Sequence, residues 1–217
     1  MYHSRLTTHA SRYVFSHYLV NQINCCHMRL IWSLYLRILG WTLKGSFPYH
    51  IKKCVVIVGP HTSSWDFVIG IAFRSKLRLT HAKYLGKAEL FKGPFGFIFR
   101  KLGGYPVERS EQHNMVDQAA SLFEGKDIFR LVLSPEGTRK KVERLRTGFY
   151  YIAKKAGVPI VMVGMDFARK EVSFSEPLYP SGNEAADFQK IYQFYAPISG
   201  KIPEQGMAHL LNPHSSI

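Results

Sequence analysis

The sequence predicts a single α/β domain with a largely parallel or mixed sheet flanked by helices. Three observations support this fold class. Apolar strand-like runs alternate with amphipathic stretches of helical period, as in sheets joined by crossover helices. The chain has 217 residues, an ordinary length for one such domain. No internal repeat or low-complexity tract interrupts the pattern.

The expected elements follow from hydrophobic periodicity. The expected strands are the apolar runs 54–58, 128–133, 158–165 and 171–178. The expected helices are the stretches 64–77, 111–124, 146–156 and 184–195. In the second of these helices, Val116, Ala119 and Phe123 share one face, because residues three and four apart are neighbours on a helix. Such faces are expected to pack in the core.

Residues 28–46 are predicted to form an amphipathic interfacial helix that precedes this domain. Polar or small residues recur every three or four positions in an apolar background: Arg29, Ser33, Arg37, Gly40 and Lys44. The uninterrupted apolar stretches are shorter than the roughly 20 residues that a membrane-spanning helix needs. A helix lying in the headgroup region of a membrane fits this pattern, and a core-packed amphipathic helix is the alternative.

The two ends of the chain differ from the centre. Residues 1–27 lack acidic side chains, show no steady periodicity and lack the apolar core of a secretory signal. We interpret them as an extra segment, either disordered or an over-extended start with Met28 beginning the functional protein; a transit peptide has a similar composition. Residues 201–217 are predicted to be a poorly ordered tail. The chemistry is therefore assigned to residues 47–200.

The string HTSSWD at 61–66 follows the first apolar run and the turn Gly59-Pro60. Residues five apart on one helix point about 140° away from each other and would not meet. Because the turn redirects the chain, we expect the helix to start at residue 63 or 64, with Asp66 in its first turn and His61 outside. The imidazole can then donate one N–H to the carboxylate, leaving the other nitrogen to accept a hydroxyl proton. The alternative is a loop histidine without a catalytic role.

The string SPEGTR at 134–139 follows the second apolar run. Arg139, beside a glycine that exposes backbone N–H groups, suits a phosphate oxyanion. Glu136 is expected to brace Arg139 or to accept a hydrogen bond from a substrate hydroxyl. Both strings occupy loops after the carboxyl ends of predicted strands, where α/β sheets carry their sites. Taken alone, the tetrapeptide EGTR at 136–139 also fits a strand-to-helix turn with an incidental ion pair.

Two more blocks lie in the same stretch of chain. Residues 103–109 form a glycine turn into an extended stretch ending on Arg109, and residues 158–163 form an apolar strand introduced by proline. With these four blocks, which span residues 54–165, the chain resembles the glycerophosphate acyltransferase family of 1-acyl-glycerol-3-phosphate acyltransferase-like enzymes. Pro60 and Ser134 depart from the residues common in that family, asparagine and phenylalanine. Neither departure removes a titrating or phosphate-binding group.

The resemblance implies a role for each matching residue. His61 is then the base, Asp66 orients it, and Arg109 and Arg139 bind phosphate. Lys87 matches a lysine that often precedes the second block, and it is either a further phosphate contact or a solvated surface residue. The implied acceptor-binding residues are Lys87, Arg109, Glu136, Gly137, Thr138 and Arg139.

The reaction implied is transfer of a fatty acyl group from an acyl-ACP or acyl-CoA thioester to the hydroxyl of a lysophosphatidic-acid-like acceptor in phospholipid synthesis. Since the thioester brings its own leaving group, neither a covalent enzyme intermediate nor a cofactor is expected. The three cysteines have no metal-ligand spacing, so no metal is expected. The alternatives are acylation of another lysolipid or an amino-acid-based lipid, and a non-catalytic lipid-binding protein of the same fold.

Charge indicates the partner surface. The net charge is +14, and Asp66 is the first acidic residue in the chain, a balance that favours anionic partners. Lysine and arginine are spread along the chain without a nucleic-acid-binding motif, so an anionic membrane is expected rather than nucleic acid. The cysteines suggest no disulfide framework, consistent with a reducing compartment. The expected location is peripheral or monotopic, on the cytoplasmic face of the membrane.

The segment 91–102 reads FKGPFGFIFRKL and is rich in phenylalanine. Three interpretations remain open from the sequence. The segment lines an acyl tunnel, dips into lipid, or forms a buried hairpin-like connection.

Overall fold

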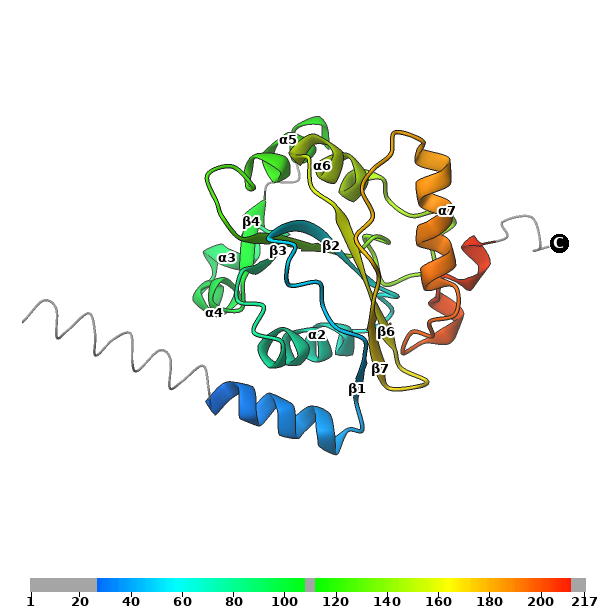
Figure 1. The fold of residues 1–217 in the computed structure, drawn as a ribbon. Coiled ribbons are helices and arrows are strands. Elements are labelled where there is room, and N and C mark those ends of the chain that lie inside the picture. The colour runs from blue at the N-terminus through cyan, green and yellow to red at the C-terminus, as the bar shows by residue number, and fades with distance from the viewer. Residues whose placement is uncertain (1–26, 108–111, 212–217) are drawn as a thin grey trace, which may run out of the picture.

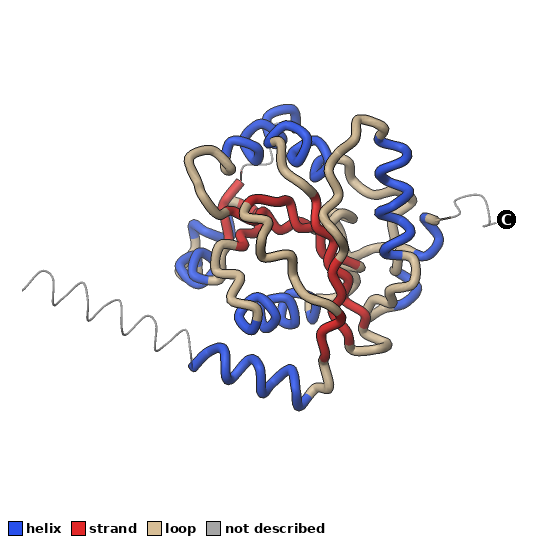
Figure 2. The backbone as a smooth tube through the Cα atoms, viewed as in Figure 1, coloured by secondary structure: helices blue, strands red, loops and turns tan. Residues whose placement is uncertain are grey.

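The computed structural model describes residues 27–107 and 112–211 (Figure 1). The strands form a seven-stranded sheet in the order β1-β7-β6-β2-β5-β3-β4. Every neighbouring pair is parallel except β6 and β7. In Figure 2 the strands (red) make one central layer with helices (blue) around it. The predicted single α/β domain is confirmed.

The strands are β1 (Thr42–Lys44), β2 (Lys53–Gly59), β3 (Ala82–Lys87), β4 (Gly104–Val107), β5 (Phe129–Leu133), β6 (Ile160–Asp166) and β7 (Glu171–Phe174). The helices after β1 are α2 (Trp65–Lys76), α3 (Glu89–Lys92), α4 (Gly96–Lys101), α5 (Gln112–Ser121), α6 (Gly148–Ala156) and α7 (Glu184–Tyr195). Two 3-10 turns follow: η1 (Pro203–Gln205) and η2 (Ala208–Leu210). Residues 27–38 are also helical.

Strand β2 is buried on both of its faces. Because successive side chains of a strand point to opposite sides, Val55 and Ile57 pack with α5, α6 and α7, whereas Cys54 and Val56 pack in a cluster on the other side. A strand covered on both faces reads as a continuous apolar run. This explains why the run at 54–58 was recognisable from the sequence.

The predicted first helix is present but shorter than the range 28–46, so its predicted end at residue 46 is wrong. The helix formed by residues 27–38 stops before β1, which pairs in parallel with β7 at the edge of the sheet. The recurrence of small or polar residues continued past the true end of the helix. The periodicity therefore hid a change from helix to strand.

Gly40 ends this helix. Its φ of +76° lies in the left-handed region that favours glycine. The N–H of Gly40 donates to the carbonyl of Arg37 at 3.0 Å, and the N–H of Trp41 donates to the carbonyl of Leu36 at 2.8 Å. This pair of bonds is the Schellman arrangement, and the side chains of Trp41 and Leu36 are buried in the same cluster. The closure turns the chain into β1.

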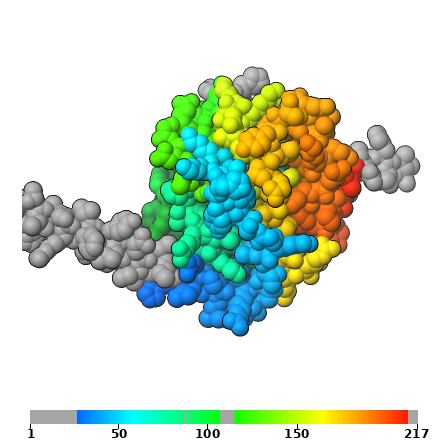
Figure 3. Space-filling view, in the orientation of Figure 1, coloured from blue at the N-terminus to red at the C-terminus, as the bar shows by residue number. Residues whose placement is uncertain are grey.

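The helix formed by residues 27–38 is apolar on more than one side. Leu36 is fully buried beside residues of α2. The opposite side exposes a further set of apolar side chains, with Leu34 59% and Ile38 74% accessible. Figure 3 shows this segment, in blue, at the surface along the bottom of the molecule. A core-packed helix would bury such side chains, so core packing alone does not account for this composition.

The phenylalanine-rich segment 91–102 forms the short helices α3 and α4, so a hairpin-like connection is wrong. Phe91 is buried, whereas Phe95 and Phe97 are 66% and 65% accessible. Strands β3 and β4, which flank this segment, were not predicted as a pair. Strand β4 has four residues, and both strands contain glycine, which weakens a strand signal.

The predicted tail at 201–217 is wrong for the residues up to 211; residues 212–217 lie outside the described part. Met207 and Leu210 are 1% and 4% accessible and belong to the core cluster that includes α7. Pro203 and the glycines break any helical or strand period in this segment. Two anchoring side chains in irregular turns leave no periodic signal.

The burial of Met207 makes a stability prediction. Met207→Ala should lower the free energy of unfolding by about 2–5 kcal/mol, because truncating a fully buried side chain leaves a cavity. Urea unfolding followed by circular dichroism measures this. Ile202→Ala, at a partly exposed position of the same segment, should change stability by less than about 0.5 kcal/mol. Equal losses in the two variants would contradict the packing described.

Candidate active site

Two neighbouring parallel strands deliver the two sequence strings to one edge of the sheet. Strand β2 pairs with β5 in parallel, with Ile57 opposite Leu133. His61 follows the end of β2, and Glu136 follows the end of β5. The backbone N–H of His61 donates to Glu136 Oε1 at 2.8 Å, which joins the two loops directly. The expectation that both strings lie in one site is met by this geometry.

The histidine and the aspartate meet as their spacing predicts. Helix α2 begins at Trp65, so Asp66 lies in its first turn and His61 lies outside the helix. His61 Nδ1 is 3.0 Å from Asp66 Oδ2, and the imidazole is 30% accessible. The same carboxylate oxygen accepts the backbone N–H groups of Thr62 and Ser63, each at 2.8 Å. The buried carboxylate therefore fixes both the loop and the ring.

At the start of α2, the Ser63 hydroxyl accepts the N–H of Trp65 at 3.3 Å. Ser64 occupies the N-cap position and makes no side-chain capping hydrogen bond. The N–H groups ahead of the helix are satisfied instead by Asp66, the residue that also orients His61. Structural and orienting roles thus fall on one side chain.

Glu136 lies beneath the site. Its side chain is 2% accessible, and Oε2 accepts a hydrogen bond from the Ser134 hydroxyl at 3.1 Å. The expected brace to Arg139 is absent from the contacts of the described residues, because both carboxylate oxygens face the two loops. Burial raises the pKa of Glu136, although the His61 N–H and Ser134 hydroxyl partly offset this.

Arg139 lies on the accessible side of the site. Its guanidinium donates to the hydroxyl of Ser64, between His61 and the start of α2. Gly137 has a φ of +68°, a conformation that glycine adopts without strain, and the Thr138 hydroxyl accepts the N–H of Lys140 at 3.3 Å. The loop therefore presents an exposed cation beside the histidine.

For two of the predicted phosphate-binding residues, Lys87 and Arg109, the structure does not describe the side chain. Lys87 is the last residue of β3, which pairs with β5, so its backbone lies two strands from β2 in the sheet. Arg109 lies outside the described residues, directly after the chain leaves β4. Their proposed contacts with phosphate remain predictions.

The C-terminal segment also contributes to the site, which sequence reasoning missed. The N–H of Ile202 donates to the Thr62 hydroxyl at 3.2 Å. The side-chain amide of Gln205 faces the carbonyl oxygens of Thr62 and Arg139, and its nitrogen donates to both in the amide orientation that satisfies these acceptors. These contacts connect the two loops of the candidate site from a third direction. No sequence motif predicts these contacts, because they join residues about 140 positions apart that only the fold brings together.

Below the site, Tyr195 at the end of α7 supports β2. Its hydroxyl donates to the carbonyl of Ile57 at 2.7 Å. Burial, with the nearby Glu136 carboxylate adding to it, raises the pKa of Tyr195 well above its ordinary value. The phenol therefore remains a neutral donor. Within residues 27–107 and 112–211, no group of three or more His, Cys, Asp or Glu side chains is arranged to hold a metal ion.

Comparison with known families decides the identity of this arrangement. Residues 42–166, more than half of the chain, match the model of the acyltransferase family. The chain belongs to the acyltransferase family. The matched region runs from β1 to the end of β6, so it contains both loops of the site. The family predicted from the four sequence blocks is confirmed.

A solved acyltransferase has the same fold. The crystal structure of the 1-acyl-sn-glycerophosphate (LPA) acyltransferase PlsC from Thermotoga maritima aligns with a TM-score of 0.50 and 18% sequence identity. The alignment covers 86% of this chain and 79% of that chain. No curated protein matches the sequence. At 18% identity the structural likeness establishes the fold of this acyltransferase.

The raised pKa of Glu136 makes a prediction about pH. The folded state holds the Glu136 proton more tightly than the unfolded state, so this group contributes stability below its unfolded pKa and loses it as pH rises through its folded pKa. Glu136→Gln cannot ionise. The melting temperature of the variant minus that of the wild type should therefore increase from pH 4 to pH 8.

Calorimetry across this pH range measures the difference. Glu143→Gln, which removes an exposed carboxylate, should leave the pH dependence unchanged. A difference between Glu136→Gln and wild type that stays constant with pH would show that Glu136 is not buried as described.

Proposed function

We propose that this acyltransferase moves a fatty acyl group from an acyl thioester to the free hydroxyl of a lysophosphatidic-acid-like acceptor, in phospholipid synthesis. The observation that carries the proposal is the contact between His61 Nδ1 and Asp66 Oδ2, on a loop whose Ser64 hydroxyl accepts a hydrogen bond from the exposed Arg139. The proposed base and the proposed phosphate-binding cation thereby meet at the same loop. The lysophosphatidic acid assignment draws on the activity for which the Thermotoga maritima enzyme is named, and it is a proposal for this chain.

The geometry suggests how proton transfer proceeds. With Nδ1 donating to the Asp66 carboxylate, His61 holds its proton on that nitrogen and keeps Nε2 as an acceptor. Nε2 takes the hydroxyl proton of the acceptor as the oxygen attacks the thioester carbonyl. The same proton then passes to the departing thiolate. Acyl-ACP and acyl-CoA both supply this leaving group, so either is a suitable donor and no cofactor is required.

Positioning of the acceptor is assigned to the cations. Arg139 holds the phosphate of the acceptor, with Arg109 and Lys87 as further contacts, so that the free hydroxyl reaches His61. A fixed phosphate converts a bimolecular encounter into an intramolecular one. Gly137 and Thr138 shape the loop that carries Arg139, and Glu136 holds this loop against the His61 loop.

We further propose a peripheral or monotopic location on an anionic membrane, at its cytoplasmic face. The exposed apolar side chains of residues 27–38 and the net charge of +14 support this assignment. None of the helices described here has both the length and the hydropathy to span a bilayer.

Removing the proposed base tests the reaction. His61→Ala should reduce kcat by about 10²- to 10⁴-fold, the usual contribution of a positioned general base. The assay uses lysophosphatidic acid with acyl-CoA and acyl-ACP donors in parallel. His50→Ala, at an exposed histidine elsewhere, should keep full activity. Acyl transfer at the wild-type rate in His61→Ala would refute the proposed mechanism.

Arg139→Ala tests acceptor recognition. For phosphate-bearing acceptors, kcat/KM should fall on the order of 10- to 100-fold, the range of a hydrogen bond to a charged group. For a phosphate-free monoacylglycerol acceptor the loss should be small. Arg144→Ala, at another exposed arginine, is the matched control. Equal losses on both acceptor classes would remove Arg139 from phosphate binding.

A further inference from the structure

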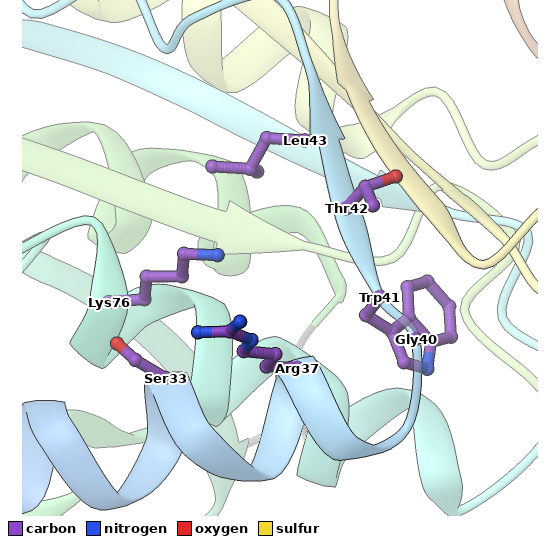
Figure 4. A pocket seen from close by; sticks show the side chains of 7 residues that line it. All are labelled: Ser33, Arg37, Gly40, Trp41, Thr42, Leu43 and Lys76. Atoms are coloured by element: carbon purple, nitrogen blue, oxygen red, sulfur yellow. The ribbon is translucent and has the colours of Figure 1, made fainter.

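A second cluster of cations lies between the first helix and α2. A cavity of about 480 Å³ is lined by Ser33, Arg37, Gly40, Trp41, Thr42, Leu43 and Lys76. Figure 4 shows Ser33 and Arg37 rising from the first helix toward Lys76, which extends into the same space from the end of α2. The apolar walls come from β1 and the residue before it. The cavity thus combines two cations, a hydroxyl and an apolar wall.

This cavity is separate from the candidate active site. Lys76 is the last residue of α2, whereas Asp66 lies in its first turn. Ten residues at 1.5 Å each place the two positions about 15 Å apart along the helix. Of the predicted site residues whose side chains the structure describes, none lines the cavity. The cavity is therefore a second candidate binding site.

The cavity carries uncompensated positive charge. In the described part of the chain, no carboxylate forms an ion pair with Arg37 or Lys76. Lys170 adds a third cation near Gly40, a residue that lines the cavity. If Gly40 carried a Cβ, that atom would lie 3.9 Å from the Nζ of Lys170. Glu171 follows Lys170 in sequence, but its carboxylate forms an ion pair with Lys44 at 3.8 Å. The local excess therefore favours an anionic ligand.

Helix dipoles do not neutralise this charge. Arg37 and Lys76 each lie in the last turn of a helix, where the carbonyl ends attract cations. Each helix end amounts to about half a negative charge, so two ends offset only about half of the two side-chain charges. Lys76 also lies 5.8 Å from the centroid of the Phe73 ring, a contact that leaves its charge intact.

The cavity borders the exposed apolar strip of the first helix. Successive residues of a helix turn by about 100°, so Leu34 and Ile38 point about 160° away from the buried Leu36. Ser33 and Arg37 project about 60° and 100° from Leu36, between the buried side and the exposed strip. The exposed strip consists of Leu30, Ile31, Leu34 and Ile38. A ligand at Arg37 thus has apolar surface directly beside it.

We propose that this cavity binds the phosphate of an anionic phospholipid headgroup in the membrane, at a site distinct from the acceptor site. Arg37 and Lys76 contact the phosphate, Ser33 donates a hydrogen bond, and the acyl chains lie against Leu34 and Ile38. A free phosphate would gain nothing from the apolar strip, whereas a lipid satisfies both features. The site would hold the protein on the membrane through one helix and the end of another. The inference shares the membrane location with the proposed function but does not depend on its reaction.

The test compares two double variants of the full chain. Arg37→Ala/Lys76→Ala removes the cluster, and Arg144→Ala/Lys154→Ala removes two exposed cations elsewhere, one of them also in the last turn of a helix. Cosedimentation uses vesicles of phosphatidylcholine with and without 20% phosphatidylglycerol. We expect the cluster variant to bind the anionic vesicles on the order of 10- to 30-fold more weakly, and the control variant to bind within about threefold of wild type. Unchanged melting temperatures establish that both variants are folded.

Two outcomes of the vesicle-binding experiment would overturn the proposal. Equal weakening in both variants means that only bulk charge attracts the membrane. Displacement of the wild type from vesicles by inorganic phosphate, at matched ionic strength, means that the cavity takes soluble phosphate.

Acyl transfer to detergent-dispersed acceptor separates this proposal from the enzymatic one. The cluster variant should retain wild-type kcat there, and a loss would assign the cavity to the reaction itself and so contradict a separate lipid site. Absence of acyl transfer in the wild type would count against the proposed function alone, because the vesicle result judges the cavity independently.

Discussion

The parallel pairing of β2 with β5 is the constraint on which the site depends. Two strands that run side by side in the same direction place their following loops together, whatever their separation in sequence. Here the pairing brings His61 and Glu136, 75 residues apart, into a direct hydrogen bond. The continuous apolar run that buries β2 on both faces holds this pairing in the centre of the sheet. Core packing and site geometry therefore have one origin.

Two buried carboxylates convert this adjacency into a defined geometry. Asp66 accepts two backbone N–H groups and faces the His61 ring. Glu136 accepts the backbone N–H of His61 and the hydroxyl of Ser134. A loop that crosses the end of a sheet otherwise leaves such donors without partners. The carboxylates satisfy them and orient the imidazole at once. The residues that look catalytic in the sequence are thus also those that hold the loop in shape.

The sequence predicted the centre of the fold better than its margins. Strands β2, β5 and β6 are buried on both sides and show as apolar runs, and α7 ends where its stripe ends at Tyr195. The meeting of His61 with Asp66 followed from a turn and a helix start. Strand β3 was missed because lysine and glycine interrupt its apolar residues, and β4 was anticipated only as an extended stretch within residues 103–109.

What the sequence did not reveal depends on tertiary contacts. The family resemblance implied that Glu136 binds the acceptor, yet its carboxylate is buried and accepts hydrogen bonds from the His61 N–H and the Ser134 hydroxyl. The length of the first helix was overestimated, since the closure at Gly40 fits the same small-residue spacing as a continuing helix. The role of residues 200–207 rests on isolated bonds to Thr62 and Arg139, which no local pattern encodes.

The packing of Met207 against Gly59 has a consequence for synthesis of the chain. Gly59 ends β2, and a side chain there would collide with Met207, so the start of the histidine loop rests on the last part of the described fold. A ribosome adds about 5–20 residues per second, and some 140 residues separate this loop from its support. About 7–28 s of translation thus pass before the support exists. The emerging polypeptide holds its histidine and aspartate early, but the segment that steadies them is translated only about 140 residues later.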